Sequence, residues 1–189
     1  MTLFFFTVSL VAGAALLALS VATLKQPTIA FWPPPGIDTW QYRTFWWLFR
    51  VFILGTVLVC ILDFGAIGNQ HVAQFIVGIP LAITGFGLAF YVTFLLGWRD
   101  AHGEANGLTT GGWYRWSRNP IYVVTIMGLV GLGLLAHSWF AYCLLSVWAA
   151  LYVAAAYLEE PWLEQQYGDA YRAYKSEVSR FVGRHSPEF

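Results

Sequence analysis

The residues best suited to chemistry in this sequence lie in two short polar stretches, each beside a long apolar run. The first stretch, residues 109–122, carries Arg115 and Arg118 among four aromatic side chains. The second opens with the adjacent carboxylates Glu159 and Glu160, at the end of an apolar segment. Carboxylates in such a place are costly to desolvate and need a partner. We expect them either to pair with Arg115 or Arg118, or to accept hydrogen bonds from a bound ligand. The plainer interpretation of the two arginines is that they anchor the chain at the membrane surface.

The other reactive side chains are weaker candidates. His102 and Glu104 lie in a loop, where a lone histidine is more often a solvated or capping group than a base. Cys60 and Cys143 lie in apolar segments, so we expect them to pack rather than to form a disulfide, bind metal or react as thiolates. No cluster of His, Cys, Asp and Glu has metal-ligand spacing, and no metal site is predicted.

The composition is that of an integral membrane protein. The chain of 189 residues is 58% hydrophobic, 19% aromatic and only 11% charged, and its mean hydropathy is +0.59. Long apolar segments predict an all-α protein with five transmembrane helices. These helices are expected at residues 3–24, 45–64, 75–96, 121–135 and 139–158. The last two form a predicted helical hairpin. An amphipathic helix is expected to follow from Glu159 on the membrane surface, with Pro161 in its first turn.

The positive charges predict which loops share a side of the membrane. All ten basic residues fall in the connectors or tail of one side: Lys25, Arg43, Arg50, Arg99, Arg115, Arg118, Arg172, Lys175, Arg180 and Arg184. The positive-inside rule therefore places the N-terminus outside, and the C-terminus and both polar stretches in the cytoplasm. The formal net charge of zero argues against a nucleic-acid partner.

A proline-rich connector joins the first two predicted spans. It contains the run WPPPG at residues 32–36, which cannot be helical through its prolines. We expect a stiff linker at the membrane interface, with Trp32 among the lipid headgroups.

Taken together, the two polar stretches resemble the signature of the integral-membrane methyltransferases, the isoprenylcysteine carboxyl methyltransferase and phospholipid N-methyltransferase families. The stretches read LTTGGWYRWSRNPIY at residues 108–122 and EEPWLEQQYGDAYRAY at residues 159–174. The family pattern has Gly-x-Tyr-x-x-x-Arg-His-Pro-x-Tyr, a helical hairpin, and then Glu-Glu-x-x-Leu-x-x-x-Phe-Gly-x-x-Tyr-x-x-Tyr. The resemblance covers about residues 80–182, and the first two spans match only in being apolar.

The resemblance implies a single membrane methyltransferase domain over residues 1–189, with variable first spans at 1–74 and a catalytic core at 75–182. It implies S-adenosylmethionine as the cofactor, bound at the cytoplasmic face. The implied cofactor-binding residues are Leu108, Gly111, Tyr114, Arg118, Pro120, Glu159, Glu160, Tyr171 and Tyr174. The implied catalytic residues are Arg118, Asn119, Tyr122 and Glu160. Asn119 stands where the family more often has histidine, so a histidine base is in doubt there and Glu160 or Arg118 would have to position the ligands.

The acceptor implied by the resemblance is a lipid-like molecule that enters from the bilayer. A prenylated cysteine carboxylate, a phospholipid amine, a smaller thiol and an apolar lipid all remain open, and the sequence does not determine the oligomeric state. Two other functions remain compatible with the sequence. One is an NADPH-dependent membrane reductase of the sterol or steroid type, whose C-terminal half has a similar loop. The other is a membrane protein that keeps this fold without catalysis.

Overall fold

The computed structural model describes residues 1–96 and 107–183 of the chain. Within these ranges the chain is all-helical, as predicted, and contains no strand. The elements are α1 (Thr2–Lys25), η1 (Pro27–Ile29), α2 (Trp40–Leu62), α3 (Val72–Leu96), η3 (Gly112–Arg115), α4 (Pro120–Ala136) and α5 (Trp139–Glu177). Four residues considered above lie outside the described ranges: Arg99, His102, Glu104 and Arg184.

The helices confirm a multi-pass integral membrane protein. Among the described residues, α1, α2, α3 and α5 are long and apolar enough to cross a membrane. α4, the first arm of the predicted hairpin, is shorter, with 17 residues. At about 1.5 Å per residue it extends roughly 25 Å, against a hydrocarbon layer of about 30 Å. A fifth complete crossing therefore stays a prediction.

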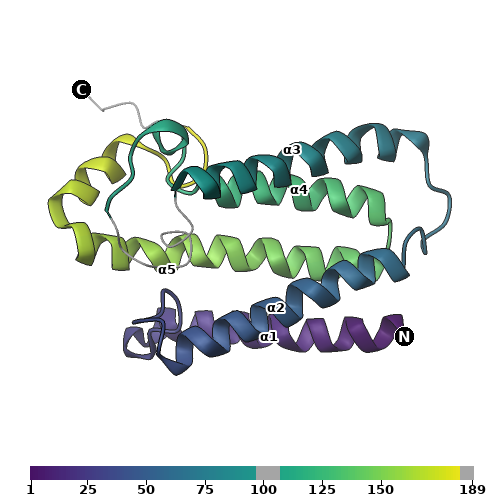
Figure 1. Cartoon of the computed structure of the whole chain (residues 1–189), viewed down its shortest axis with the longest axis horizontal. Helices are drawn as coiled ribbons and strands as arrows, with labels where there is room; N and C mark the ends of the chain where they lie inside the picture. Colours follow the sequence, from purple (N-terminus) through teal and green to yellow (C-terminus); the bar gives the residue numbers. More distant parts are fainter. Residues whose placement is uncertain (97–106, 184–189) are drawn as a thin grey trace.

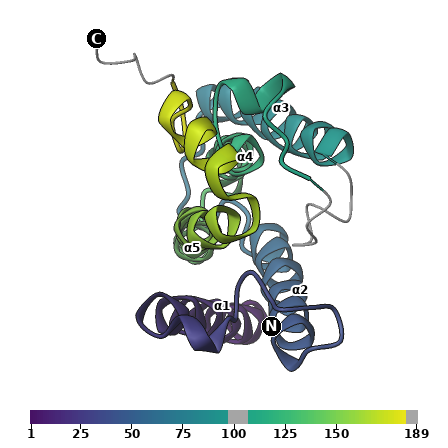
Figure 2. The ribbon, with the colours of Figure 1, turned by 90° about the vertical axis from the view of Figure 1, so that its left-hand side faces the viewer.

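The helices run back and forth along one axis, and this gathers the polar segments at one end (Figure 1). α5 lies between the α1–α2 pair and the α3–α4 pair, an arrangement seen again in Figure 2. The N-terminus lies at one end of the bundle. The connector after α1, the loop before α4 and the last part of α5 lie at the other. The two polar stretches are thus brought to the same end of the molecule.

α3 and α4 approach each other closely because glycines face each other along their contact. A Cβ atom added at Gly85 would lie 2.3 Å from the backbone nitrogen of Gly128, and one added at Gly131 would lie 2.4 Å from that of Ala82. Small residues allow membrane helices to pack with their backbones nearly in contact. This contact sets the position of two helices that contribute to the cavity described below.

The proline-rich connector folds back into the bundle, so the expectation that Trp32 lies among lipid headgroups is wrong. Phe31 is fully buried and Trp32 is only 7% exposed. The Trp32 ring stacks on Phe45 of α2, with ring centroids 4.1 Å apart, and the Phe31 N–H donates to Thr23 Oγ1 at 3.2 Å. Burying two large aromatic rings and finding a partner for the indole N–H favours this packing over exposure to the interface.

α5 is longer than predicted because it continues through Glu159 to Glu177. Pro161 therefore lies inside α5, and its predicted place in the first turn of a separate helix is wrong. The change of direction comes later, at Gly168, whose φ of 54° and ψ of −127° are favourable only for glycine. Figure 1 shows the last part of α5 turned away from the first part. The amphipathic character of this last part stays a prediction.

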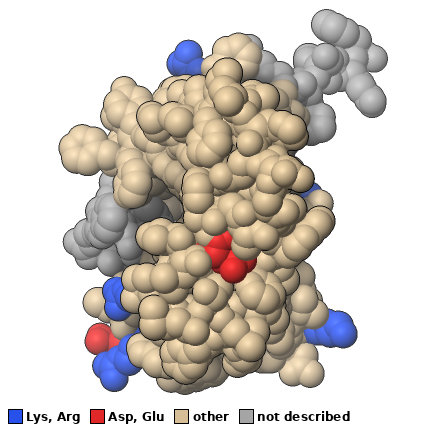
Figure 3. Space-filling model, turned by 90° about the vertical axis from the view of Figure 1, so that its right-hand side faces the viewer, with Lys and Arg blue, Asp and Glu red and all other residues tan. Residues whose placement is uncertain are grey.

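The end of the bundle that holds the N-terminus, opposite the two polar stretches, is almost uncharged. Figure 3 views this end and shows mostly uncharged surface, with Lys and Arg mainly around the outline. Residues 63–71 and 137–138, which connect helices there, contain no Lys or Arg. Ser138 caps α5 by accepting the Ala141 N–H at 3.2 Å, and it donates to Asp63. The segregation of charge agrees in space with the predicted topology, while the orientation in the membrane stays a prediction.

Candidate active site

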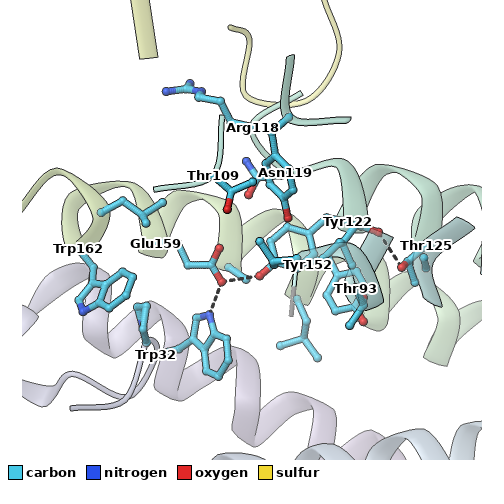
Figure 4. Close-up of a pocket in the computed structure, with 18 of the residues that line it drawn as sticks. Trp32, Thr93, Thr109, Arg118, Asn119, Tyr122, Thr125, Tyr152, Glu159 and Trp162 are labelled. Atoms are coloured by element: carbon cyan, nitrogen blue, oxygen red, sulfur yellow. Dashed lines mark hydrogen bonds between the residues drawn. The ribbon is translucent and has the colours of Figure 1, made fainter. Parts of the chain in front are cut away.

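A cavity of about 530 Å³ lies at the polar end of the bundle (Figure 4). Its walls come from α1, the connector, α2, α3, the loop before α4, α4 and α5. Most of the described residues that line it are apolar or aromatic, and the charged ones among them are Arg118 and Glu159. The volume falls in the usual range for small-molecule sites, and few polar groups in an apolar lining are typical of such sites.

Most of the predicted site residues lie in this cavity. Those that line it are Leu108, Tyr114, Arg118, Asn119, Tyr122, Glu159, Tyr171 and Tyr174. Gly111, Pro120 and Glu160 are not among the lining residues. Residues of both polar stretches therefore line the same cavity.

Glu159 presents its carboxylate to the cavity. Its Oε1 accepts hydrogen bonds from the indole Nε1 of Trp32, at 2.8 Å, and from the hydroxyl of Tyr122. Figure 4 shows these two bonds meeting at one oxygen. No described residue bonds Oε2 of the same carboxylate. Trp32 was missed as a site residue because nothing in the local sequence indicates that the connector folds inward.

Glu160 points to another side of α5, where it is 5% exposed and binds cations. Its two oxygens accept from Nε and Nη2 of Arg180 at 2.6 and 2.8 Å, and Oε1 lies 2.9 Å from Nη2 of Arg118. This confirms the expected pairing with Arg118, whereas Arg115 is exposed and does not line the cavity. The hydrogen bond from Arg180 to Glu160 raises the pKa of the Arg180 guanidinium, which therefore stays charged.

Arg118 has hydrogen-bond donors to spare. Its side chain is 7% exposed, and Nη2 is paired with Glu160. Its Nε and Nη1 are buried and have no partner among the described residues. Buried donors without acceptors are costly in a folded protein, so such atoms indicate a place for a ligand acceptor.

A family model for phospholipid methyltransferases matches residues 73–170, just over half of the chain. The chain belongs to the phospholipid methyltransferase family. It is therefore a membrane methyltransferase with a lipid-type substrate. No significant match was found among curated proteins or among solved structures.

Two parts of the chain outside the matched region also contribute to the cavity or to the loop beside it. Trp32 reaches Glu159 from the connector, and the segment 178–183 lies along the loop that carries Arg118. The Arg118 N–H donates to the Ser179 carbonyl at 3.0 Å, and Asn119 Nδ2 donates to the Arg180 carbonyl at 3.0 Å. Asn119, at the position where the family more often has histidine, thus binds the C-terminal segment.

Proposed function

We propose that this chain transfers a methyl group from S-adenosylmethionine to the amine of a lipophilic acceptor. The observation that supports this best is that one cavity holds two complementary charged groups with free bonding capacity. Among the described residues, two nitrogens of Arg118 and one carboxylate oxygen of Glu159 have no hydrogen-bond partner. The first fits an anionic group and the second a cationic or N–H-bearing one.

The residues present fit S-adenosylmethionine. The free Nε and Nη1 of Arg118 suit its carboxylate, which would satisfy donors that are otherwise buried without partners. Tyr114, Tyr171 and Tyr174 also line the cavity, and aromatic rings suit both an adenine and a sulfonium. When bound, S-adenosylmethionine would supply an electrophilic methyl group: the S–CH3 bond breaks as the N–CH3 bond forms, S-adenosylhomocysteine leaves, and the amine gives up one proton. The protein holds the reactants in line and excludes water, which its mostly apolar lining favours.

An amine acceptor suits this cavity better than a carboxylate acceptor. The Oε2 atom of Glu159 can accept a hydrogen bond from the N–H of an amine, whereas an ionised carboxylate acceptor has no hydrogen to donate. Trp32, Tyr122 and Tyr152 surround the carboxylate with aromatic rings, which also attract cationic groups. We therefore favour a phospholipid amine over a prenylated cysteine carboxylate, with Tyr122 and Glu159 on the acceptor side.

The proposal keeps the single-domain interpretation, with the core at residues 75–182 and the polar end of the bundle in the cytoplasm. It adds one feature, namely that the connector in the first 74 residues closes part of the cavity wall. Arg118 is the proposed cofactor ligand. Glu160, away from the lining, holds Arg118 in place.

The experiment uses the full chain in mixed micelles with methyl-tritiated S-adenosylmethionine. Phosphatidylethanolamine and a farnesylated cysteine are offered separately as acceptors. We expect label in the amine lipid only, and a loss of labelling in Glu159→Gln. Glu164→Gln serves as the matched control, because Glu164 forms ion pairs with Lys175 and Arg172 and does not line the cavity.

Other outcomes would reject the proposal. Label on the farnesylated cysteine alone would show that the acceptor is a carboxylate. Binding of NADPH without binding of S-adenosylmethionine would favour the reductase, and affinity for neither cofactor would favour a non-catalytic role.

A further inference from the structure

The connector between α1 and α2 lies outside the family-matched region, yet it contributes directly to the cavity. Trp32 and Pro33 line the cavity, and family matching begins only at residue 73. The indole Nε1 of Trp32 donates to Oε1 of Glu159 at 2.8 Å (Figure 4). The connector, which lies outside the family match, thus contacts the carboxylate of Glu159 that lines the cavity.

The Trp32 ring is held firmly enough to set the direction of its N–H. It stacks on Phe45 with centroids 4.1 Å apart and an interplanar angle of 24°. It also meets the edge of Trp46, with centroids 6.2 Å apart. The connector is itself attached to its neighbours, because the Gln41 side chain donates to the Ile29 carbonyl at 3.2 Å. The hydrogen bond to Glu159 therefore comes from a fixed donor.

The two donors to Glu159 are both neutral, and both bind the same oxygen. Trp32 and Tyr122 orient the carboxylate without neutralising its charge. Arg118, Lys175 and Arg180 pair with the neighbouring carboxylate of Glu160. Among the described residues none bonds the other oxygen of Glu159, Oε2, which is therefore open to a ligand.

We propose that Trp32 is a positioning residue, which holds Oε1 of Glu159 so that Oε2 is presented to the amine of the acceptor. This inference rests on the proposed function, because the acceptor amine is the ligand that Oε2 would bind. It makes the connector a determinant of acceptor binding. The affinity for the cofactor, which Arg118 is proposed to bind, should not depend on Trp32.

Trp32→Phe tests this role because it retains an aromatic ring to stack on Phe45 and removes only the N–H donor. We expect the KM for phosphatidylethanolamine to rise about 10-fold or more, in line with the loss of a hydrogen bond to a charged group. The Kd for S-adenosylmethionine should be unchanged. Trp47→Phe is the matched control, since Trp47 is 65% exposed on α2 and does not line the cavity. If Trp32 had a purely structural role, Trp32→Phe would weaken the binding of both ligands or destabilise the fold.

An infrared measurement tests the contact without relying on activity. The carboxyl band of Glu159 is identified as the band that disappears in Glu159→Gln. We expect this band to shift in Trp32→Phe, because one donor to Oε1 is gone, and to stay in place in Trp47→Phe.

The outcomes separate the two proposals. An unshifted band, or a shifted band with an unchanged KM for the amine lipid, would overturn the role of Trp32 while leaving the proposed function intact. If the wild-type protein methylates no amine lipid, the proposed function fails, and with it the acceptor role of Trp32. The infrared comparison then still decides whether Trp32 holds Glu159.

Discussion

Glu159 and Glu160 are adjacent in the sequence but bind opposite kinds of partner. Glu159 accepts from the neutral donors Trp32 and Tyr122 and lines the cavity. Glu160 does not line the cavity, and it binds the cations Arg118 and Arg180. Successive residues of an α-helix point about 100° apart, which is enough to place the two carboxylates on different sides of α5. One carboxylate is thereby available to a ligand and the other holds the site together.

Glu160→Gln should destabilise the protein, because it leaves the buried guanidinium of Arg118 without its counter-charge. Breaking a buried ion pair by removing one partner costs about 3 to 5 kcal/mol. We also expect weaker binding of S-adenosylmethionine, since Arg118 loses the group that orients it. Thermal unfolding in detergent and a cofactor titration measure the two effects.

The control for this prediction is Glu164→Gln. Glu164 pairs with Lys175 at 3.3 Å on the surface, so its removal should change the free energy of unfolding by less than about 1 kcal/mol. Equal effects of the two substitutions would contradict the structural role given to Glu160.

Arg118→Ala should lower the affinity for S-adenosylmethionine by about 10- to 100-fold, because the hydrogen bonds of its free nitrogens to an anionic group are lost. Arg118→Lys should not restore the affinity, since an ammonium lacks the planar fork of donors. Isothermal titration in detergent measures the Kd. Arg115 is an exposed arginine of the same loop, and the variant Arg115→Ala should bind the cofactor with unchanged affinity. A wild-type Kd in Arg118→Ala would remove this residue from the site.

Gly85→Ala should destabilise the bundle and reduce methyl transfer. The added Cβ would lie 2.3 Å from the Gly128 nitrogen, so α3 and α4 would have to separate, at a cost of about 2 kcal/mol or more. The displacement would move Phe86 and Tyr122, which line the cavity. Unfolding in detergent and the labelling assay report both consequences.

Gly87→Ala is the comparison for the substitution at Gly85. Nothing lies within 4 Å of a Cβ at Gly87, so stability should stay the same or rise by up to about 1 kcal/mol through better helix propensity. A similar loss in both variants would show that the close approach of α3 and α4 does not explain the effect.

The helices and most of the cavity residues were predictable from sequence because their signals are local. Long apolar runs predict α1, α2 and α3 closely, and the spacing of the two polar stretches indicates one methyltransferase site. The paired carboxylates at an apolar helix end also predict a buried partner, which Arg118 supplies.

The errors have a common physical cause. Pro161 indicates a helix start when only its neighbours are considered. In the structure α5 continues through Pro161, and its direction changes at Gly168. Trp32 beside three prolines suggests an interfacial residue, because the pattern does not show that Phe45 offers a stacking surface.

By itself, the sequence determined the membrane class, the all-helical fold and the two polar stretches of the methyltransferase family. Only the tertiary structure decided which of the two glutamates faces the cavity, and that Trp32 and Arg180 each bind one of them. Hydropathy and motif spacing depend on residues near each other in the chain. These contacts join Trp32 to Glu159 across 127 positions and depend on how the helices pack.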